Sequence, residues 1–172
     1  MKKATIILLS FCCLMALASC HKEGVNLFRG DYSFKTSGSA TIQQFTYFFD
    51  TVTPPAYTIH LPNEIGQLQI SQLERRSDSV LVVMNHLNGE VVVARGYCEG
   101  QDIYLKKFKH DIIGLSIDGD IDVRCKVQVS GKGHLYDDNT LILNLNYTGA
   151  FVLGLVRYTI ESDNVQMVAY RN

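Results

Sequence analysis

Hydrophobic and polar positions alternate along much of this chain with the two-residue period of β-strands. In VRCKVQVSG, every second side chain is apolar, at Val123, Cys125, Val127 and Val129. In TLILNLNYT, the same period places apolar side chains at Leu141, Leu143, Leu145 and Tyr147. Because successive side chains of a strand point to opposite faces, this alternation predicts strands with one face packed and one face in water.

The rest of the chain continues as short segments rich in Val, Ile, Leu, Tyr and Thr, separated by Gly, Asn, Asp and Ser. Hairpins are expected where two such segments flank a turn, at RRSD, LNG, EGQ, GKGHLYDDN and SDN. DYSFKTS and ATIQQFTYFFD form a further candidate pair around Gly38. No long stretch shows the 3.6-residue apolar period of a helix, so the pattern predicts an all-β domain.

The connections between these segments are short, which favours pairing between strands that follow each other in the sequence. We therefore predict an antiparallel meander β-barrel of roughly 8–10 strands. A closed barrel also leaves no exposed sheet edge. The alternative is a two-sheet β-sandwich.

Cys98 and Cys125 provide a test between these two folds. Alternation places both side chains inward, in segments that a meander separates by the strand DIYLKKFK. Strands two apart are about 9–10 Å from each other, whereas a disulfide requires Cα atoms within about 7 Å. We therefore expect two buried, unlinked thiols, while a disulfide would favour the sandwich.

The amino-terminal segment departs from the alternation. Lys2 and Lys3 precede an apolar run over residues 4–18 that ends in small residues. This order of charge, apolar run and small residues is typical of a secretory signal, and the run is shorter than the ~20 residues that a membrane-spanning helix needs. We expect residues 1–19 to be removed as a signal peptide.

The residues at the end of this run, Leu17-Ala18-Ser19-Cys20, resemble the lipobox of bacterial lipoproteins. The resemblance implies cleavage before Cys20 and attachment of fatty acyl chains, such as palmitate, to Cys20. Several acyl chains hold a protein firmly to a bilayer. We expect residues 20–29 to form a tether and residues 30–172 to form one domain. The lipoprotein resemblance also favours the cell outer membrane, because His21-Lys22-Glu23 lacks the Asp that retains some lipoproteins at the inner membrane, and it leaves both the periplasmic and the surface face open.

The combination of a lipobox, a tether and an up-and-down β domain resembles the lipocalin-like, or calycin-like, lipoproteins of Gram-negative bacteria. The resemblance covers the whole mature chain but rests on architecture. The lipocalin G-x-W signature is absent because the chain has no Trp, although GDYSF from Gly30 to Phe34 occupies a comparable place. The resemblance implies a barrel that binds a small apolar or amphipathic molecule.

Charge and motifs restrict the function further. The chain has 16 basic and 17 acidic residues without a block of either sign, which does not favour nucleic-acid binding. Asp118, Asp120 and Asp122 resemble the start of a calcium loop, but Val123 and Val129 replace its required Gly and Glu. No hydrolase or nucleotide-binding motif is present, so we expect no enzymatic activity and no cofactor.

Histidines offer the remaining candidate chemistry. They are dispersed, at His60, His86, His110 and His134, without the close spacing of a zinc motif. We expect surface or rim positions for them and no metal site. Apart from lipidation at Cys20, the sequence assigns no functional residue, and the ligand-binding residues are unknown.

Two functions remain open at this point. The first is a lipid-anchored, non-catalytic binding protein that holds a small apolar or amphipathic ligand in the barrel or at its open end. The second is an interaction subunit of a cell-envelope protein assembly, with a filled barrel. A lumen of several hundred Å³ would favour the first function, and a packed lumen would favour the second.

Overall fold

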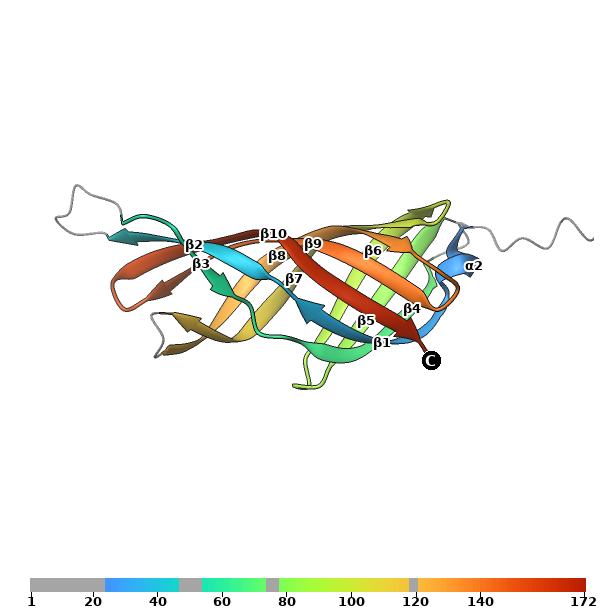
Figure 1. Ribbon diagram of the computed structural model, residues 1–172, viewed down its shortest axis with the longest axis horizontal. Helices are drawn as coiled ribbons and strands as arrows, with labels where there is room; N and C mark the ends of the chain where they lie inside the picture. Colours follow the sequence, from blue (N-terminus) through green and yellow to red (C-terminus); the bar gives the residue numbers. More distant parts are fainter. Residues whose placement is uncertain (1–23, 47–53, 74–77, 118–120) are drawn as a thin grey trace, which may run out of the picture.

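The computed structural model describes residues 24–46, 54–73, 78–117 and 121–172 (Figure 1). One short helix, α2 (Val25–Phe28), precedes the strands. The strands are β1 (Gly30–Ser37), β2 (Ser39–Thr46), β3 (Tyr57–His60), β4 (Ile65–Gln72), β5 (Ser79–His86), β6 (Val91–Glu99), β7 (Asp102–Ile117), β8 (Ile121–Leu135), β9 (Thr140–Leu153) and β10 (Val156–Arg171).

All the strands belong to one antiparallel sheet that closes on itself. From β4 to β10 each strand pairs with its sequence neighbour, and β1 pairs with both β4 and β10. This arrangement makes a closed eight-stranded barrel, with β2 and β3 as two further strands beside β10. The predicted meander barrel is therefore confirmed, and the sandwich alternative is excluded.

The segments around Gly38 do not form the expected hairpin. β1 and β2 run in the same direction and pair with successive parts of β10. Gly38 lies where this long strand passes close to β10, since a Cβ at Gly38 would lie 2.8 Å from the Cα of Val165. A larger residue would force the two backbones apart, so Gly38 connects two strands instead of turning the chain back.

The SDN segment is also not a turn. β10 continues through it as a single strand, with a register shift between Ser162 and Val165. Ser162 Oγ donates a hydrogen bond to the carbonyl of Ser39, and the side chain of Asn164 accepts one from the Ser39 N–H. The polar residues that indicated a turn thus stabilise a β-bulge opposite Gly38.

In the GKGHLYDDN segment the turn expected from Asp-Asp-Asn is confirmed, but the bend or bulge expected at the glycines is not found. β8 extends through Gly131 and Gly133 to Leu135, and the turn lies at residues 136–139. A Cβ at Gly133 would lie 2.6 Å from a methyl group of Leu143. These glycines therefore make room for the side chains of β9 instead of bending the chain.

The barrel interior is apolar and filled. The inward faces predicted from the alternation of β8 and β9 are confirmed, because all eight of those side chains are buried. Cys98 and Cys125 are buried, unlinked thiols on β6 and β8, with β7 between them, as expected. On the outer face of β8, Arg124, Lys126 and Gln128 are exposed.

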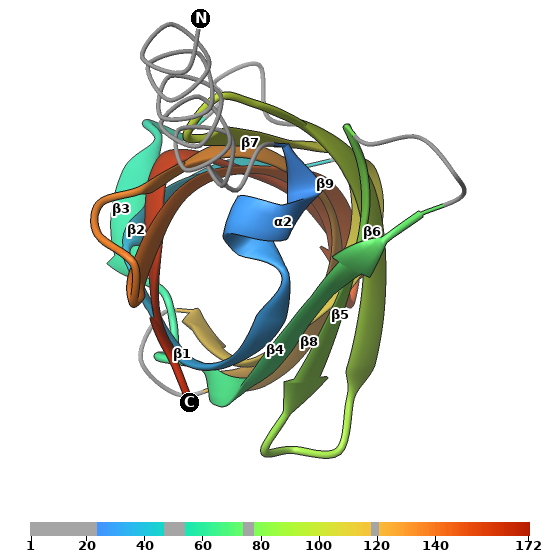
Figure 2. The ribbon, with the colours of Figure 1, turned by 90° about the vertical axis from the view of Figure 1, so that its right-hand side faces the viewer.

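One end of the barrel is closed by the helix α2, which lies across the opening (Figure 2). Val25 and Phe28 are buried in the core, and Tyr32 Oη donates a 2.7 Å hydrogen bond to the Phe28 carbonyl. From Gly24 onward, part of the expected tether therefore belongs to the packed domain. Cys20 and the expected signal peptide lie outside the described residues. None of the helices in the described part of the chain is long and apolar enough to cross a membrane.

Candidate functional site: a buried carboxylate and two histidines

A group of buried and half-buried polar side chains interrupts the apolar lumen where β5 ends and β6 begins. These two strands have 8 and 9 residues, whereas β7 to β10 have 14 to 16 and continue past this level. The group consists of Glu64, His86 and His110, with Glu90 beside it. We refer to Glu64, His86 and His110 as the polar cluster.

Glu64 lies in the connection between β3 and β4, and Thr36 of β1 fixes its backbone. The N–H of Glu64 donates to Thr36 Oγ1 at 3.0 Å, and the N–H of Thr36 donates to the Glu64 carbonyl at 2.8 Å. Thr36 is itself buried. Two reciprocal hydrogen bonds thus hold the carboxylate of Glu64 toward the lumen.

His86 reaches the lumen through the regular alternation of β5. Val80, Val82 and Met84 are buried, and His86 occupies the next inward position at the end of the strand. Its backbone N–H donates to the carbonyl of Glu90 across the turn. The ring therefore projects inward from a closed hairpin.

His110 reaches the lumen because β7 is irregular. Register shifts occur between Leu105 and Phe108 and between Ile112 and Leu115. Each shift exchanges the inward and outward faces, because side-chain direction alternates with a period of two. The segment between the shifts therefore turns His110 inward, whereas unbroken alternation from Leu105 would have placed it outside.

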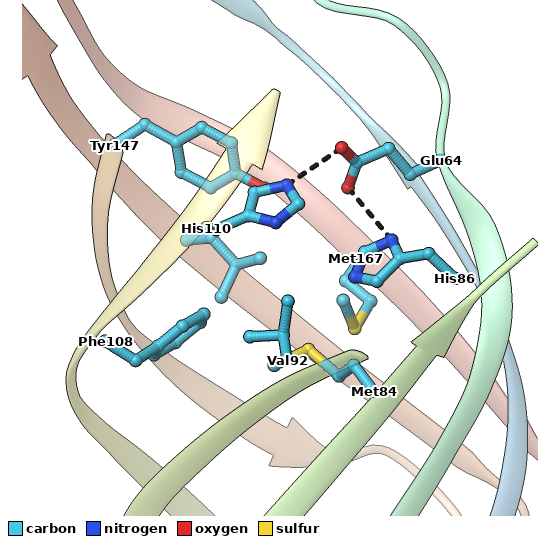
Figure 3. A pocket seen from close by; sticks show the side chains of 9 residues that line it. Glu64, Met84, His86, Val92, Phe108, His110, Tyr147 and Met167 are labelled. Carbon is cyan, nitrogen blue, oxygen red and sulfur yellow. Dashed lines mark hydrogen bonds and ion pairs between the residues drawn. The ribbon is translucent and has the colours of Figure 1, made fainter. Parts of the chain in front are cut away.

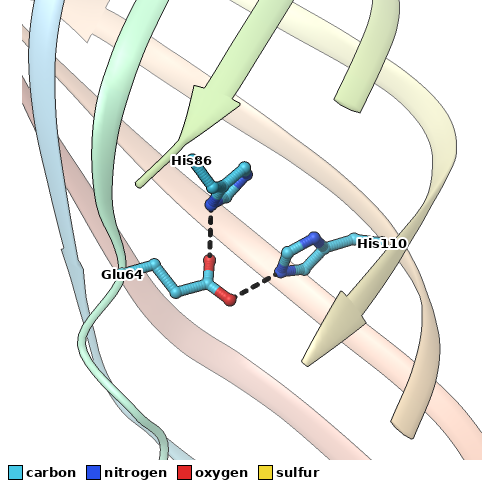
Figure 4. A group of neighbouring side chains, drawn as sticks. All are labelled: Glu64, His86 and His110. Atoms are coloured by element: carbon cyan, nitrogen blue, oxygen red, sulfur yellow. Dashed lines mark hydrogen bonds and ion pairs between the residues drawn. The ribbon is translucent and has the colours of Figure 1, made fainter. Parts of the chain in front are cut away.

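The carboxylate of Glu64 bridges the two imidazole rings (Figure 4). Glu64 Oε1 lies 2.8 Å from His110 Nε2, and Glu64 Oε2 lies 3.5 Å from His86 Nδ1. The two rings are stacked, with centroids 5.0 Å apart and planes 19° apart. His86 and His110 are only 7% and 4% exposed, so this interaction takes place away from solvent.

Glu90 approaches the other side of His110. Its Oε1 lies 3.4 Å from His110 Nδ1 and accepts a 3.1 Å hydrogen bond from the backbone N–H of Asp111. His110 thus lies between two carboxylates, one at each ring nitrogen. The rings of Phe34 and Tyr147 approach His86 and His110 edge-on.

The electrostatic environment differs between the two histidines. Burial lowers the pKa of His86, and the neighbouring His110 lowers it further despite the charge of Glu64. Burial also acts to lower the pKa of His110, but the hydrogen bond and charge of Glu64, together with Glu90, raise it overall. Burial and the two carboxylates raise the pKa of Tyr147, so its hydroxyl stays neutral.

Several polar atoms of this group are buried without a hydrogen-bond partner. They are Glu64 Oε2, both ring nitrogens of His86, His110 Nδ1 and Glu90 Oε2. A buried polar group without a partner costs about 1–3 kcal/mol, so native proteins contain few of them. The presence of five such atoms in one place indicates a position where a further polar or cationic species can bind.

Two spaces adjoin the polar cluster. On the lumen side, a cavity of about 10 Å³ is lined by the cluster and by apolar side chains such as Met84, Phe108 and Met167 (Figure 3). This volume is close to that of one water molecule. On the other side, an open cup of about 280 Å³ is lined by Glu64 and His86 together with Ile65, Leu87 and Ile113.

The surface or rim position expected for the histidines is confirmed for His60 and His134 and is wrong for His86 and His110. His60 and His134 are exposed, and His134 pairs with Asp102 at 2.8 Å. The expected surface or rim position is wrong for His86 and His110, because both are buried and lie together. The sequence contained one signal for His86, namely its inward position after Val82 and Met84. Within the acidic segment, Asp122 is exposed, and Asp118 and Asp120 lie outside the described residues.

Comparisons with known proteins do not identify a family or a function for this chain. No family matches the chain, and no curated protein matches its sequence. Among solved structures, EF1p2_mFAP2b bound to DFHBI has a TM-score of 0.46 and 8% identity, covering 86% of this chain and 95% of that chain. Ail, the attachment invasion locus protein of Yersinia pestis, has a TM-score of 0.37 and 11% identity, covering 84% and 99%. These likenesses are too distant to bear on function.

Proposed function

We propose that this chain is a non-catalytic, lipid-anchored protein of the bacterial outer membrane that binds a small amphipathic molecule in the cup beside the polar cluster. The cup carries the proposal, because it combines polar groups with an apolar lining. A ligand's polar group would face Glu64 and His86, and its apolar part would contact Ile65, Leu87 and Ile113. The volume of about 280 Å³ is near the lower end of small-molecule sites.

The packing of the lumen favours a ligand in the cup over one inside the barrel. The space beside the polar cluster has room for about 10 Å³, and a second interior space next to Thr36 and Leu61 is equally small. A small apolar ligand would have to displace buried side chains to enter either space. The open cup needs no such rearrangement.

The lipid anchor is proposed from the lipobox at Cys20. Gly24, four positions after Cys20, precedes the helix that closes one end of the barrel. The polar cluster and the cup lie at the level where β5 ends and β6 begins, away from that helix. An anchor at Cys20 would therefore hold the closed end toward the membrane and leave the cup accessible.

The second function, an interaction subunit, is the one that a packed lumen was expected to favour, and the interior spaces are indeed only about 10 Å³ each. An exposed surface on β6 supports it as well. Val91, Val93 and Tyr97 are exposed on the outer face of β6, with the exposed Arg95 between Val93 and Tyr97. An exposed apolar strip of this kind is typical of protein interaction surfaces. The chain could then act as an interaction subunit of an envelope assembly.

The test is native mass spectrometry of the full-length protein purified from its own envelope. We expect a co-purified small molecule in the wild type and its loss in Ile113→Asp, which places a charge in the cup. Val152→Asp is the matched control, because Val152 is exposed on β9 and does not line the cup. An identical bound mass in all three proteins would contradict binding in the cup.

Two further variants separate the remaining parts of the proposal. A co-purified protein that is lost in Val93→Asp would support the interaction subunit instead. Cys20→Ala should abolish incorporation of a labelled fatty acid. Continued labelling of this variant would contradict the lipid anchor.

A further inference from the structure

We infer that Glu64, His86 and His110 bind a divalent transition-metal ion of the zinc type. One ligand atom from each of the three side chains lies within 4.8 Å of the others. The inference uses two residues of the proposed cup, but it does not depend on an organic ligand. Metal binding can therefore be tested separately from the proposed function.

The donor set determines the class of ion. Two imidazole nitrogens and one carboxylate oxygen suit zinc and neighbouring divalent transition metals, whereas calcium and magnesium prefer oxygen ligands only. Three protein ligands also leave a fourth position for water, as in open zinc sites. The cup provides access for the ion and room for that water.

The spacing of the donor atoms suits coordination after a small adjustment. Two ligands about 2.1 Å from an ion at a tetrahedral angle lie roughly 3.4 Å apart. Glu64 Oε2 and His86 Nδ1 are 3.5 Å apart, close to this spacing. His110 Nε2 lies 2.8 Å from the other carboxylate oxygen, Oε1, so a shared ion requires the Glu64 carboxylate and the His110 ring to reorient within the 4.8 Å spread of the three donor atoms.

The buried atoms without partners support the inference independently. His86 is more than nine-tenths buried, and neither of its ring nitrogens has a hydrogen-bond partner. An ion at the polar cluster would coordinate His86 Nδ1 and one oxygen of Glu64. Without a metal, His110 has a 2.8 Å partner in Glu64, whereas the ring nitrogens of His86 have only the 3.5 Å approach of Nδ1 to Glu64 Oε2.

Glu90 completes the arrangement. A metal-binding histidine commonly donates its second ring N–H to a carboxylate, which fixes the ring and its tautomer. Glu90 Oε1 lies 3.4 Å from His110 Nδ1, on the side of the ring away from Glu64. Glu90 would therefore hold His110 with Nε2 directed at the ion, as a positioning residue and not a ligand.

The test uses the full-length protein without a histidine tag, purified in detergent and stripped of metals with a chelator. Titration with Co²⁺ reports coordination through visible absorption, and competition with Zn²⁺ gives the relative affinity. We expect one ion per chain with a tetrahedral spectrum. Zn²⁺ at 100 times its Kd should raise the ratio of folded to unfolded protein roughly 100-fold.

Variants identify the ligands. His86→Gln and His110→Gln should abolish stoichiometric Co²⁺ binding, and Glu90→Gln should weaken it about 10–100-fold. His60→Gln and His134→Gln are the matched controls, because both histidines are exposed. The inference is overturned if the wild type binds less than one ion, or if the controls lose binding as much as the ligand variants.

A substitution that retains a ligand covers the case in which the glutamine variants do not fold. His86→Cys should still bind Co²⁺ and gain a thiolate-to-metal absorption band. A folded His86→Cys protein without that band would also overturn the inference. Failure of the metal titration leaves the mass-spectrometry test of the cup unaffected, because that test detects an organic molecule.

Discussion

The barrel contains two polar arrangements, one half-buried and one largely buried, and they differ in how completely their groups are paired. At the closed end, Arg171 donates to Tyr32 Oη at 2.6 Å, to the Asp138 carbonyl at 2.6 Å and to the Leu27 carbonyl. Tyr32 in turn donates to the Phe28 carbonyl. At the polar cluster, by contrast, both ring nitrogens of His86 and one oxygen of Glu64 have no hydrogen-bond partner.

The difference separates a structural network from a binding position. Hydrogen bonds at the closed end join the first helix, the first strand and the last strand, so each contact stabilises the fold. The polar cluster brings titratable groups into an apolar lumen without satisfying them, which costs stability. We therefore expect substitutions to be costly at the closed end, whereas replacement of the whole polar cluster by apolar side chains should be nearly neutral in the absence of metal.

The largest effect is expected from Phe28→Ala. Phe28 is fully buried where α2 closes the barrel, and truncation of a buried Phe costs about 3–5 kcal/mol. Leu87→Ala is the matched control near the polar cluster, because Leu87 is 78% exposed and should change stability by less than about 0.5 kcal/mol. Denaturant unfolding measures both. Equal losses of unfolding free energy in Phe28→Ala and Leu87→Ala would mean that α2 does not unfold together with the barrel.

The next largest effect is expected from Arg171→Met. This variant loses the hydrogen bonds to Tyr32, Leu27 and Asp138, and bonds to charged groups contribute about 1.5–3 kcal/mol. We expect a loss of roughly 2 kcal/mol, against little change in Arg157→Met on the exposed face of β10. A double-mutant cycle with Tyr32→Phe should give a coupling of about 1 kcal/mol. No coupling would contradict the proposed network.

The fold was predictable wherever the alternation is regular. β8 and β9 alternate without interruption over their inward residues, and their buried faces agree with the prediction. The segments at Gly38 and SDN were wrongly predicted as turns, because glycine and small polar residues occur both in turns and in bulges. Only the pairing with β10, distant in sequence, decides between these two outcomes.

The polar cluster was less predictable, for a different reason in each residue. His86 follows the inward period of β5 and could have been assigned from it. His110 faces inward only because the register shifts at Lys106 and Lys107. A regular two-residue alternation does not predict such a shift. Glu64 lies outside any strand and is positioned by Thr36, 28 residues earlier.

A smaller effect is expected at the two thiols, which report on separate parts of the barrel. Burial raises the pKa of Cys98 to about 12 and that of Cys125 to about 11. Both should react with an alkylating reagent at least on the order of 100-fold more slowly in the folded protein than in denaturant. Peptide mass spectrometry after timed labelling measures each rate. Fast labelling of either thiol in the native protein would contradict the packed interior.

The same thiols sharpen the comparison through two further measurements. Cys98 interacts electrostatically with Tyr32 of the closed end, so Phe28→Ala should accelerate labelling of Cys98 more than that of Cys125.

The pH dependence of stability gives a second measurement on the same thiols. Because the pKa values of Cys98 and Cys125 are both raised in the folded state, the unfolded chain loses these protons first as pH rises above about 9. The contribution of the two thiols to stability should therefore be constant below that pH and be lost between about 9 and 12. Stability that rises over this range would contradict the burial of the thiols.

The smallest effect is expected from the triple variant Glu64→Leu, His86→Leu, His110→Leu without metal. Replacement of a whole buried polar group by apolar side chains of similar size is often neutral or stabilising. We expect the free energy of unfolding to change by less than about 1 kcal/mol, or to increase. Glu64→Leu alone should cost more, roughly 2 kcal/mol, because it leaves both histidines buried without the carboxylate. If the triple variant instead loses as much stability as Arg171→Met, the polar cluster stabilises the fold in the same way as the closed end, and the contrast between the two regions is wrong.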